Sequence, residues 1–193
     1  MLNIPALILS SIIWSLLWLL FVALCLRHFP WAMAHDYPPD MQQAAALPAP
    51  TPAQKRRTTL FAAAVFAILF AFAIATTLLA YAGQPASFAT LFCHLWLMGM
   101  AWNAVDLLLL DWLLICTLGS PLFLLPNTTH CAGRRNFRFH FIGFLKGCLS
   151  LPNPAHKKQP LNISGCLFCF VTQQIHPTYP SAAQKTACPY ARC

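Results

Sequence analysis

The chain has 193 residues, of which 59% are hydrophobic and 8% are charged. Soluble domains have about 45–50% apolar and about 25% charged residues, so this composition excludes an ordinary water-soluble domain and favours a protein whose solvent is the lipid bilayer. The formal net charge of +8 does not indicate nucleic-acid binding, because the basic residues stand beside the long apolar runs and form no basic domain interleaved with aromatic residues.

The first expected element is a transmembrane helix in residues 1–26. This run has no charged side chain, and it is long enough, since about 20 apolar residues cross a hydrocarbon core of about 30 Å. A cleaved signal peptide is the competing interpretation, because Ala32–Ala34 has the sequence "AMA", which resembles a cleavage site. However, the run exceeds the roughly 7–15 apolar residues of a signal peptide, and its positive charge, Arg27, follows it. We therefore expect an uncleaved anchor.

A loop with two parts is expected in residues 27–57. The first part, "HDYPPDMQ" (His35–Gln42), combines aromatic, acidic and proline residues. The second part, "AAALPAPTPAQ" (Ala44–Gln54), has the composition of an extended Ala/Pro spacer. We expect a specific structure for the first part and a simple connection for the second.

The next two apolar runs, 58–85 and 86–105, form one charge-free stretch that must fold back on itself. As a single helix, at about 1.5 Å per residue, it would be roughly 70 Å long, more than twice the hydrocarbon thickness. The sequence "AGQP" (Ala82–Pro85) supplies Gly and Pro for a turn. We therefore expect a second transmembrane helix in 58–82, then an outer turn and a third transmembrane helix in 83–118. The spans themselves are expected near residues 4–26, 60–82 and 87–110, with an extension of the third to Leu118 left open.

The second span contains a ladder of small residues at every fourth position. Such ladders permit close approach of helices in lipid, where packing drives association. The sequence therefore predicts a helix–helix face made of Ala63, Ala67, Ala71 and Ala75.

After the third span the sequence predicts a membrane-surface segment and a tail. Residues 119–151 are rich in turn residues, aromatics and arginines, and Phe137–Leu151 begins like a fourth span. Lys146 interrupts this run and two prolines follow it, so we expect it to be too short to cross. Residues 152–193 show almost no periodicity and are expected to be disordered. The predicted fold is all-α: an integral membrane helical bundle with three transmembrane helices, a partial fourth apolar segment and an irregular tail.

The basic residues predict the orientation. Arg27, Lys55–Arg57 and Arg134–Arg138 flank the spans, whereas the turn at 82–87 has no basic residue. The positive-inside rule then places the N-terminus outside, and the 27–57 loop and the C-terminal part in the cytoplasm. We expect a multi-pass protein of the cell inner (plasma) membrane.

Three segments together resemble a family of small, uncharacterised bacterial multi-pass membrane proteins. They are "HDYPPDMQ" (His35–Gln42), similar to a Tyr-Pro-x-Asp-Ile-Gln pattern in that family's first cytoplasmic loop, "DLLLLDWLLIC" (Asp106–Cys116) and "FRFHFIGFLKG" (Phe137–Gly147). The resemblance covers roughly residues 1–150 and implies a helical membrane protein, but no activity. The family has a Pro-Gly-Thr-Glu-like turn where this chain has "PNTTH" (Pro126–His130), and a full fourth helix where this chain departs after Gly147, as a frameshifted or truncated gene would.

Asp106 and Asp111 stand inside the apolar third span, although the whole sequence has only four acidic residues. A carboxylate at a helix centre costs about 2.5–3.5 kcal/mol, so we expect Asp106 at the inner boundary, near water or a partner. On an α-helix, Asn103 lies on the same face as Asp106, whereas Asp111 lies about 140° away. This geometry argues against a paired-carboxylate acid/base site.

Two interpretations of Asp106 stay open. In the functional one, Asp106 and Asn103 bind a proton, cation or substrate, with His140 or Arg138 approaching from the next segment. In the structural one, Asp106 forms an ion pair or a helix cap at the cytoplasmic end, against another helix or the basic segment Arg134–Arg138, and Trp112 anchors the helix at the membrane interface.

Two further expectations concern the relative importance of these residues. Loss of Asp106 is predicted to matter most and loss of the tail after Leu151 least, with Asp111 contributing less than Asp106 because it lies closer to water. His94, alone in the outer half of the third span, is expected to form a helix–helix hydrogen bond.

The nine cysteines raise the question of a metal site. Those in apolar helices, Cys25, Cys93 and Cys116, are expected to act as small hydrophobic residues. The tail contains "CLFC", then His176, but its second cysteine pair is separated by four residues and no zinc-ribbon knuckle surrounds it. The weak candidate ligands are therefore Cys166, Cys169, Cys188 and Cys193. We expect no metal and no other cofactor, and no βαβ pattern accompanies the Cys-x-x-Cys to favour a thioredoxin-type site.

The predicted function is that of a non-enzymatic accessory or assembly component of the membrane. Transport paths and catalytic sites need several convergent polar groups, and the spans offer only Asn103, Asp106 and His94. The alternative is a small homo-oligomeric channel or transporter, or a membrane-embedded enzyme, that uses Asp106. The expected partners are the lipid bilayer and a second helix, from another protein or from a homo-oligomer, and no nucleic acid.

Overall fold

A computed structural model describes residues 1–149, with side chains described to residue 145, and all its elements are helical. In chain order they are α1 (Ile4–His28), α2 (Pro30–Met33), the 3₁₀ helix η1 (Ala34–Asp36), α3 (Pro39–Ala45), α4 (Pro52–Ala80), α5 (Phe88–Val105), the π-helix η2 (Asp106–Thr117), the 3₁₀ helices η3 (Pro121–Phe123) and η4 (Ala132–Arg135), and α6 (Phe137–Leu149). The predicted tail and its four candidate metal ligands lie outside the described residues.

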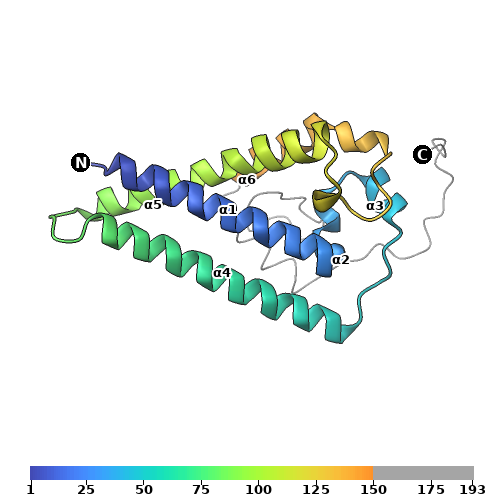
Figure 1. The fold of residues 1–193 in the computed structure, drawn as a ribbon, viewed down its shortest axis with the longest axis horizontal. Helices are drawn as coiled ribbons and strands as arrows, with labels where there is room; N and C mark the ends of the chain where they lie inside the picture. Colours follow the sequence, from blue (N-terminus) through green and yellow to red (C-terminus); the bar gives the residue numbers. More distant parts are fainter. Residues whose placement is uncertain (150–193) are drawn as a thin grey trace.

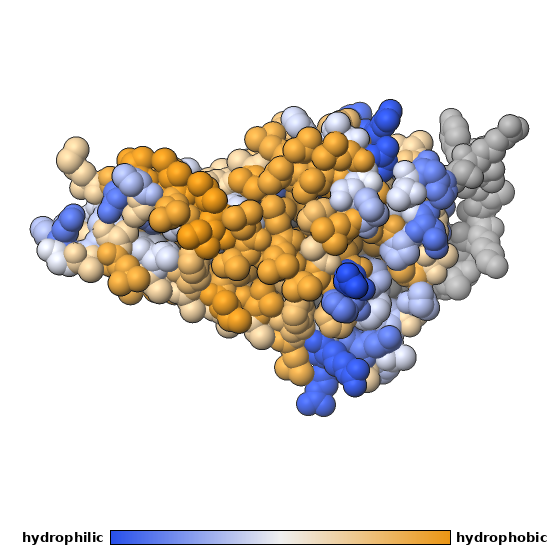
Figure 2. All heavy atoms as spheres, in the orientation of Figure 1, coloured by the Kyte–Doolittle hydropathy of each residue, from blue (hydrophilic) through white to orange (hydrophobic). Residues whose placement is uncertain are grey.

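Three helices are long and apolar enough to cross a membrane, which confirms the predicted all-α membrane bundle. They are α1, α4 and the continuous pair α5–η2 (Phe88–Thr117). Figure 1 shows α1 between α4 and α5–η2. The N-terminus and the α4–α5 turn lie at one end, which we call the turn end, whereas α2, α3, η3 and η4 lie at the other, the loop end. Figure 2 shows the apolar surface over the body of the bundle and most hydrophilic residues at the loop end.

The turns between the helices agree with the turn residues in the sequence. The predicted turn at Ala82–Pro85 is present, and its Gly83 has a φ of 75°, a conformation that suits glycine because it has no Cβ. In contrast, α4 begins at Pro52 and not at Thr58. Thr51 and Gln54 form a capping box there, and proline is favoured in a first turn, so part of the predicted spacer is helical.

Tryptophans of α1 form the centre of the bundle. Trp14 and Trp18 stack along the helix, and each meets Trp102 of α5 edge-on, at centroid distances of 4.8 and 4.9 Å. Each such aromatic pair contributes about 0.5–1.5 kcal/mol beyond its buried area. Trp14 Nε1 also donates to the Leu69 carbonyl of α4 at 3.0 Å. The tryptophans thus join all three spans.

The predicted helix–helix face of the second span is wrong for the contacts within the chain. The buried face of α4 consists of Thr58, Ala62, Phe66, Leu69, Ala73 and Thr77, whereas Ala63, Ala67, Ala71 and Ala75 are exposed. The face of α1 that meets α4 carries the large rings of Trp18 and Phe21. Such rings fill the space between two helices, so the backbones need not approach closely and small residues are not required there. Phe66 packs against Trp18 and Phe21 instead.

Candidate functional site

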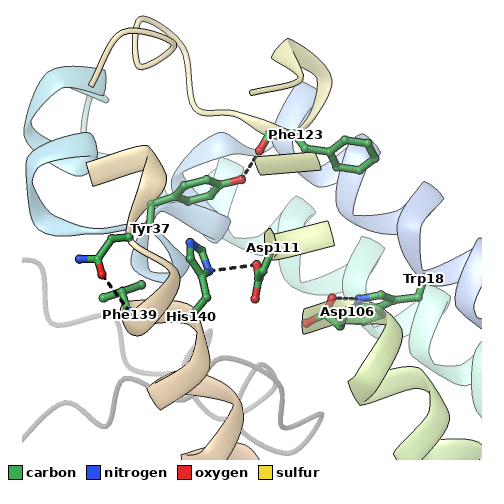
Figure 3. A network of polar contacts seen from close by, with 8 residues as sticks. Trp18, Tyr37, Asp106, Asp111, Phe123, Phe139 and His140 are labelled. Carbon is green, nitrogen blue, oxygen red and sulfur yellow. Dashed lines mark hydrogen bonds and ion pairs between the residues drawn. The ribbon is translucent and has the colours of Figure 1, made fainter. Parts of the chain in front are cut away.

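Three segments far apart in the sequence meet at the loop end. They are the η1–α3 region with Tyr37, the π-helix η2 with Asp106 and Asp111, and α6 with His140. Figure 3 shows Trp18, Asp106, Asp111 and His140 in one row, with Tyr37 beside it. These segments are the same three that carry the family resemblance. The row of four side chains, here called the polar row, is the strongest candidate for a functional site among the described residues.

Asp106 accepts a hydrogen bond from a tryptophan and not from a basic residue. Trp18 Nε1 donates to its Oδ1 at 2.8 Å, so α1 supplies a donor to the carboxylate that interrupts the apolar helix. Of the two expected neighbours of Asp106, another helix and the basic segment, the described structure has the helix, and no ion pair joins Asp106 to the basic segment. Arg134 instead donates to the Ile115 and Cys116 carbonyls at 3.3 and 3.4 Å, which places a cation at the C-terminal end of η2, where the helix dipole favours one.

Asp111, not Asp106, pairs with His140. His140 Nδ1 lies 3.0 Å from Asp111 Oδ1, and the exposed fractions of the two side chains are 1% and 13%. Burial by itself lowers the pKa of His140, but the hydrogen bond and charge of Asp111, with a smaller effect of Cys116, raise it to about 10. The imidazole is therefore charged at neutral pH. α6 covers Asp111 only in part, since 13% of its side chain stays exposed, and the expectation that Asp111 contributes less than Asp106 stays a prediction.

The π-helical geometry of η2 changes the relation between the two carboxylates. A π-helix joins residues five apart by hydrogen bonds, so Asp111 lies about one turn beyond Asp106. The α-helical spacing that would direct the two side chains apart does not apply here. At the end of η2 the Leu118 amide donates to the Leu113 carbonyl at 2.8 Å. Both carboxylates therefore lie in the polar row, each with its own donor.

Tyr37 is a site residue to which no pattern in the sequence assigned a chemical role. Its hydroxyl donates to the Phe123 carbonyl of η3 at 2.6 Å, and Gln42 Nε2 donates to its carbonyl at 2.7 Å. Burial raises its pKa well above the ordinary value, and the nearby carboxylates of Asp36, Asp111 and Asp106 raise it further. The phenol is thus a neutral donor. The only indication of Tyr37 in the sequence was its position within His35–Gln42, the part of the first loop that was expected to have a specific structure.

A second tie at the loop end joins α3 to η4. The Gly133 amide donates to Asp40 Oδ2 at 2.7 Å. A Cβ at Gly133 would collide with the same carboxylate, so glycine is required for this approach. Asp40 thereby holds the segment that carries Arg134.

The remaining predicted residues, Asn103, Arg138 and Trp112, form no hydrogen bond or ion pair with the polar row in the described structure. Within the described residues, no hydrogen bond connects the Asn103 side chain to the polar row, and Arg138 is exposed. Trp112 packs its ring against Phe137 and Phe141 of α6. It therefore contacts α6, whereas the structural interpretation had it as an anchor at the membrane interface.

His94 lies at the turn end, far from the polar row, and forms the expected helix–helix hydrogen bond. Its Nδ1 is 3.2 Å from the Tyr81 hydroxyl at the end of α4. The Asn3 amide donates to that hydroxyl at 3.1 Å, and Asn3 Nδ2 donates to the Ala80 carbonyl at 3.0 Å. This contact joins all three spans at the turn end.

The cysteines and the comparisons give no independent indication of an activity. Cys25 and Cys116 are buried as small hydrophobic residues, but Cys93 is exposed on α5. Among the described residues, no cluster of three or more His, Cys, Asp or Glu side chains could hold a metal ion. Comparison of the chain with family models, curated proteins and solved structures finds no match.

Proposed function

We propose that the protein is a non-enzymatic membrane component, an accessory or assembly subunit, whose three spans carry a folded platform. The platform consists of η1, α3, η3, η4 and α6 at the loop end. One observation carries the proposal: the polar groups there bind one another. Asp111 holds α6, Asp40 holds η4, and Tyr37 holds η3. These groups brace a surface, and such a surface suits recognition of another protein.

A partner helix within the membrane also fits this proposal. The exposed ladder of Ala63, Ala67, Ala71 and Ala75 on α4 allows close approach of a helix from another protein or a second copy. The convergence of the three resembling segments at the loop end supports membership of the bacterial membrane family that they resemble.

We further propose that the membrane is the bacterial inner membrane, with the N-terminus outside and the loop end in the cytoplasm. The exposed cations beside the spans support this orientation. The test is a Gln84→Cys variant in a background in which the nine native cysteines are replaced by serine, because Gln84 lies in the exposed turn and any other accessible thiol would also be labelled. We expect labelling by an impermeant maleimide added outside intact cells, and labelling only from the cytoplasmic side would overturn the orientation.

Affinity capture from mild detergent tests the accessory role. Tyr37→Phe and Tyr81→Phe form a matched pair, since each removes one buried hydroxyl, at the loop end and at the turn end respectively. We expect partner subunits to co-purify with the wild type and with Tyr81→Phe, and to decrease with Tyr37→Phe. Equal retention by both variants would contradict docking at the platform.

The alternative is a homo-oligomeric channel or transporter, or a membrane-embedded enzyme, that uses Asp106. The observation in its favour is the π-helix itself, because π-helical segments are frequent at functional sites and this one carries two carboxylates about one turn apart. Capture of a lone homo-oligomer, together with proton or cation flux in liposomes that Asp106→Asn abolishes, would favour the alternative over the accessory role.

A further inference from the structure

Six basic residues surround the loop end, and we call them the basic collar: Arg27, Lys55, Arg56, Arg57, Arg135 and Arg138. Arg27 lies in the last turn of α1, three follow the start of α4, and two flank the start of α6. Lys55 is half-exposed and the other five are exposed. Within the described residues, none of the six forms an ion pair. Figure 2 shows the hydrophilic residues of the loop end directly beside the apolar surface.

No acidic side chain pairs with this collar in the described part of the chain. Its four acidic residues all contact other groups: Asp36 contacts His35, Asp40 the Gly133 amide, Asp106 Trp18, and Asp111 His140. The sequence contains no other Asp or Glu. Among the described residues, the collar therefore keeps positive charge that an anion from outside the protein can neutralise.

We propose that the basic collar binds the anionic headgroups of phospholipids. The cations stand where the apolar surface of the spans ends, which is the depth of lipid phosphates. Each Lys or Arg near an anionic membrane surface contributes about 1 kcal/mol. In addition, α4 and α6 both begin at this end without an acidic residue in the first turn. A helix start carries partial positive charge, which repels the collar cations beside it. A lipid phosphate bound there would offset this repulsion.

The position of the collar favours lipid over nucleic acid or an acidic protein. Its cations are distributed over the ends of four elements around the bundle, α1, α4, η4 and α6. A macromolecule in the aqueous phase would be recognised by a basic face that projects away from the apolar surface. This inference stands independently of the proposed accessory role.

The experiment uses the full chain in mild detergent with phosphatidylglycerol, phosphatidylcholine of the same acyl chains, or inorganic phosphate. Native mass spectrometry counts the retained lipids, and a melting curve reports stabilisation. We expect phosphatidylglycerol to be retained and to raise the melting temperature, and the other two to do neither. The combined change Lys55→Gln, Arg56→Gln and Arg57→Gln is expected to weaken phosphatidylglycerol binding by about tenfold or more.

Two control variants test whether the loss of binding comes from charge and whether it depends on the collar positions. The charge-preserving set Lys55→Arg, Arg56→Lys and Arg57→Lys is expected to retain binding. The set Lys157→Gln, Lys158→Gln and Lys185→Gln removes the same net charge outside the collar and is expected to have little effect. If the first glutamine set does not fold, Arg135→Gln with Arg138→Gln gives the same test. Equal binding of both lipids, equal stabilisation by inorganic phosphate, or equal loss in the 157–185 set would overturn the proposal.

Discussion

The Asp111 carboxylate and the His140 imidazole lie 3.0 Å apart, and their side chains are 13% and 1% exposed. Removal of one partner leaves the other charge buried, which costs about 3–5 kcal/mol in fully buried pairs. We expect Asp111→Asn to lower the free energy of unfolding by about 2 kcal/mol, since Asp111 keeps some exposure. Asp106→Asn should cost less, because an amide oxygen still accepts from Trp18 Nε1.

Detergent-solubilised thermal stability checks this order. Asp40→Asn is the matched control, as it makes the same change at an exposed carboxylate. If Asp40→Asn were as damaging as Asp111→Asn, the buried pair would not have the role assigned to it. The expected order, in which Asp111→Asn costs more stability than Asp106→Asn, is the reverse of the ranking predicted from the sequence.

The same pair predicts how stability depends on pH. The pKa of His140 is about 10 in the folded protein against an ordinary 6.5, so the folded state keeps a proton that the unfolded state loses. This contribution is complete below about pH 6.5 and is lost as the pH rises toward about 10, with a slope of at most about 1.4 kcal/mol per pH unit. We expect the melting temperature of the wild type to fall more steeply than that of His140→Gln over this interval. Parallel curves would contradict the charged imidazole.

At the scale of elements, glycine at position 133 permits the contact between α3 and η4. A Cβ there would collide with the Asp40 carboxylate, whereas a Cβ at Gly99 in α5 meets nothing within 4 Å. We expect Gly133→Ala to break the hydrogen bond and cost about 1–2 kcal/mol. Gly99→Ala should be neutral or stabilising by up to about 1 kcal/mol, since alanine favours helices. We expect amide hydrogen exchange to become faster in α3 and η4 of the Gly133→Ala variant and to stay unchanged in Gly99→Ala. Faster exchange that extends to α1 would contradict a local effect of the lost hydrogen bond.

At the scale of the whole molecule, the three spans, the loop end and α6 contact one another directly within residues 1–149. A chain that ends at Leu151 is therefore expected to insert normally and to melt within a few degrees of the full chain. Proteoliposome insertion and a melting curve check this. A large loss of stability would show that the segment after Leu151 supports the bundle.

The three described spans and their approximate positions follow from the sequence, because a run without charges that is long enough to cross a bilayer is a local property of the chain. The turn at Gly83 follows for the same reason. The partners of the polar residues depend on the tertiary structure: Trp18 and Asp106 are 88 positions apart in the sequence, and no local pattern connects them. The buried face of α4 was likewise decided by the rings of α1. Finally, the π-helical winding of η2 placed Asp111 about one turn beyond Asp106 and under α6, where an α-helical reading of the same residues directed the two carboxylates apart.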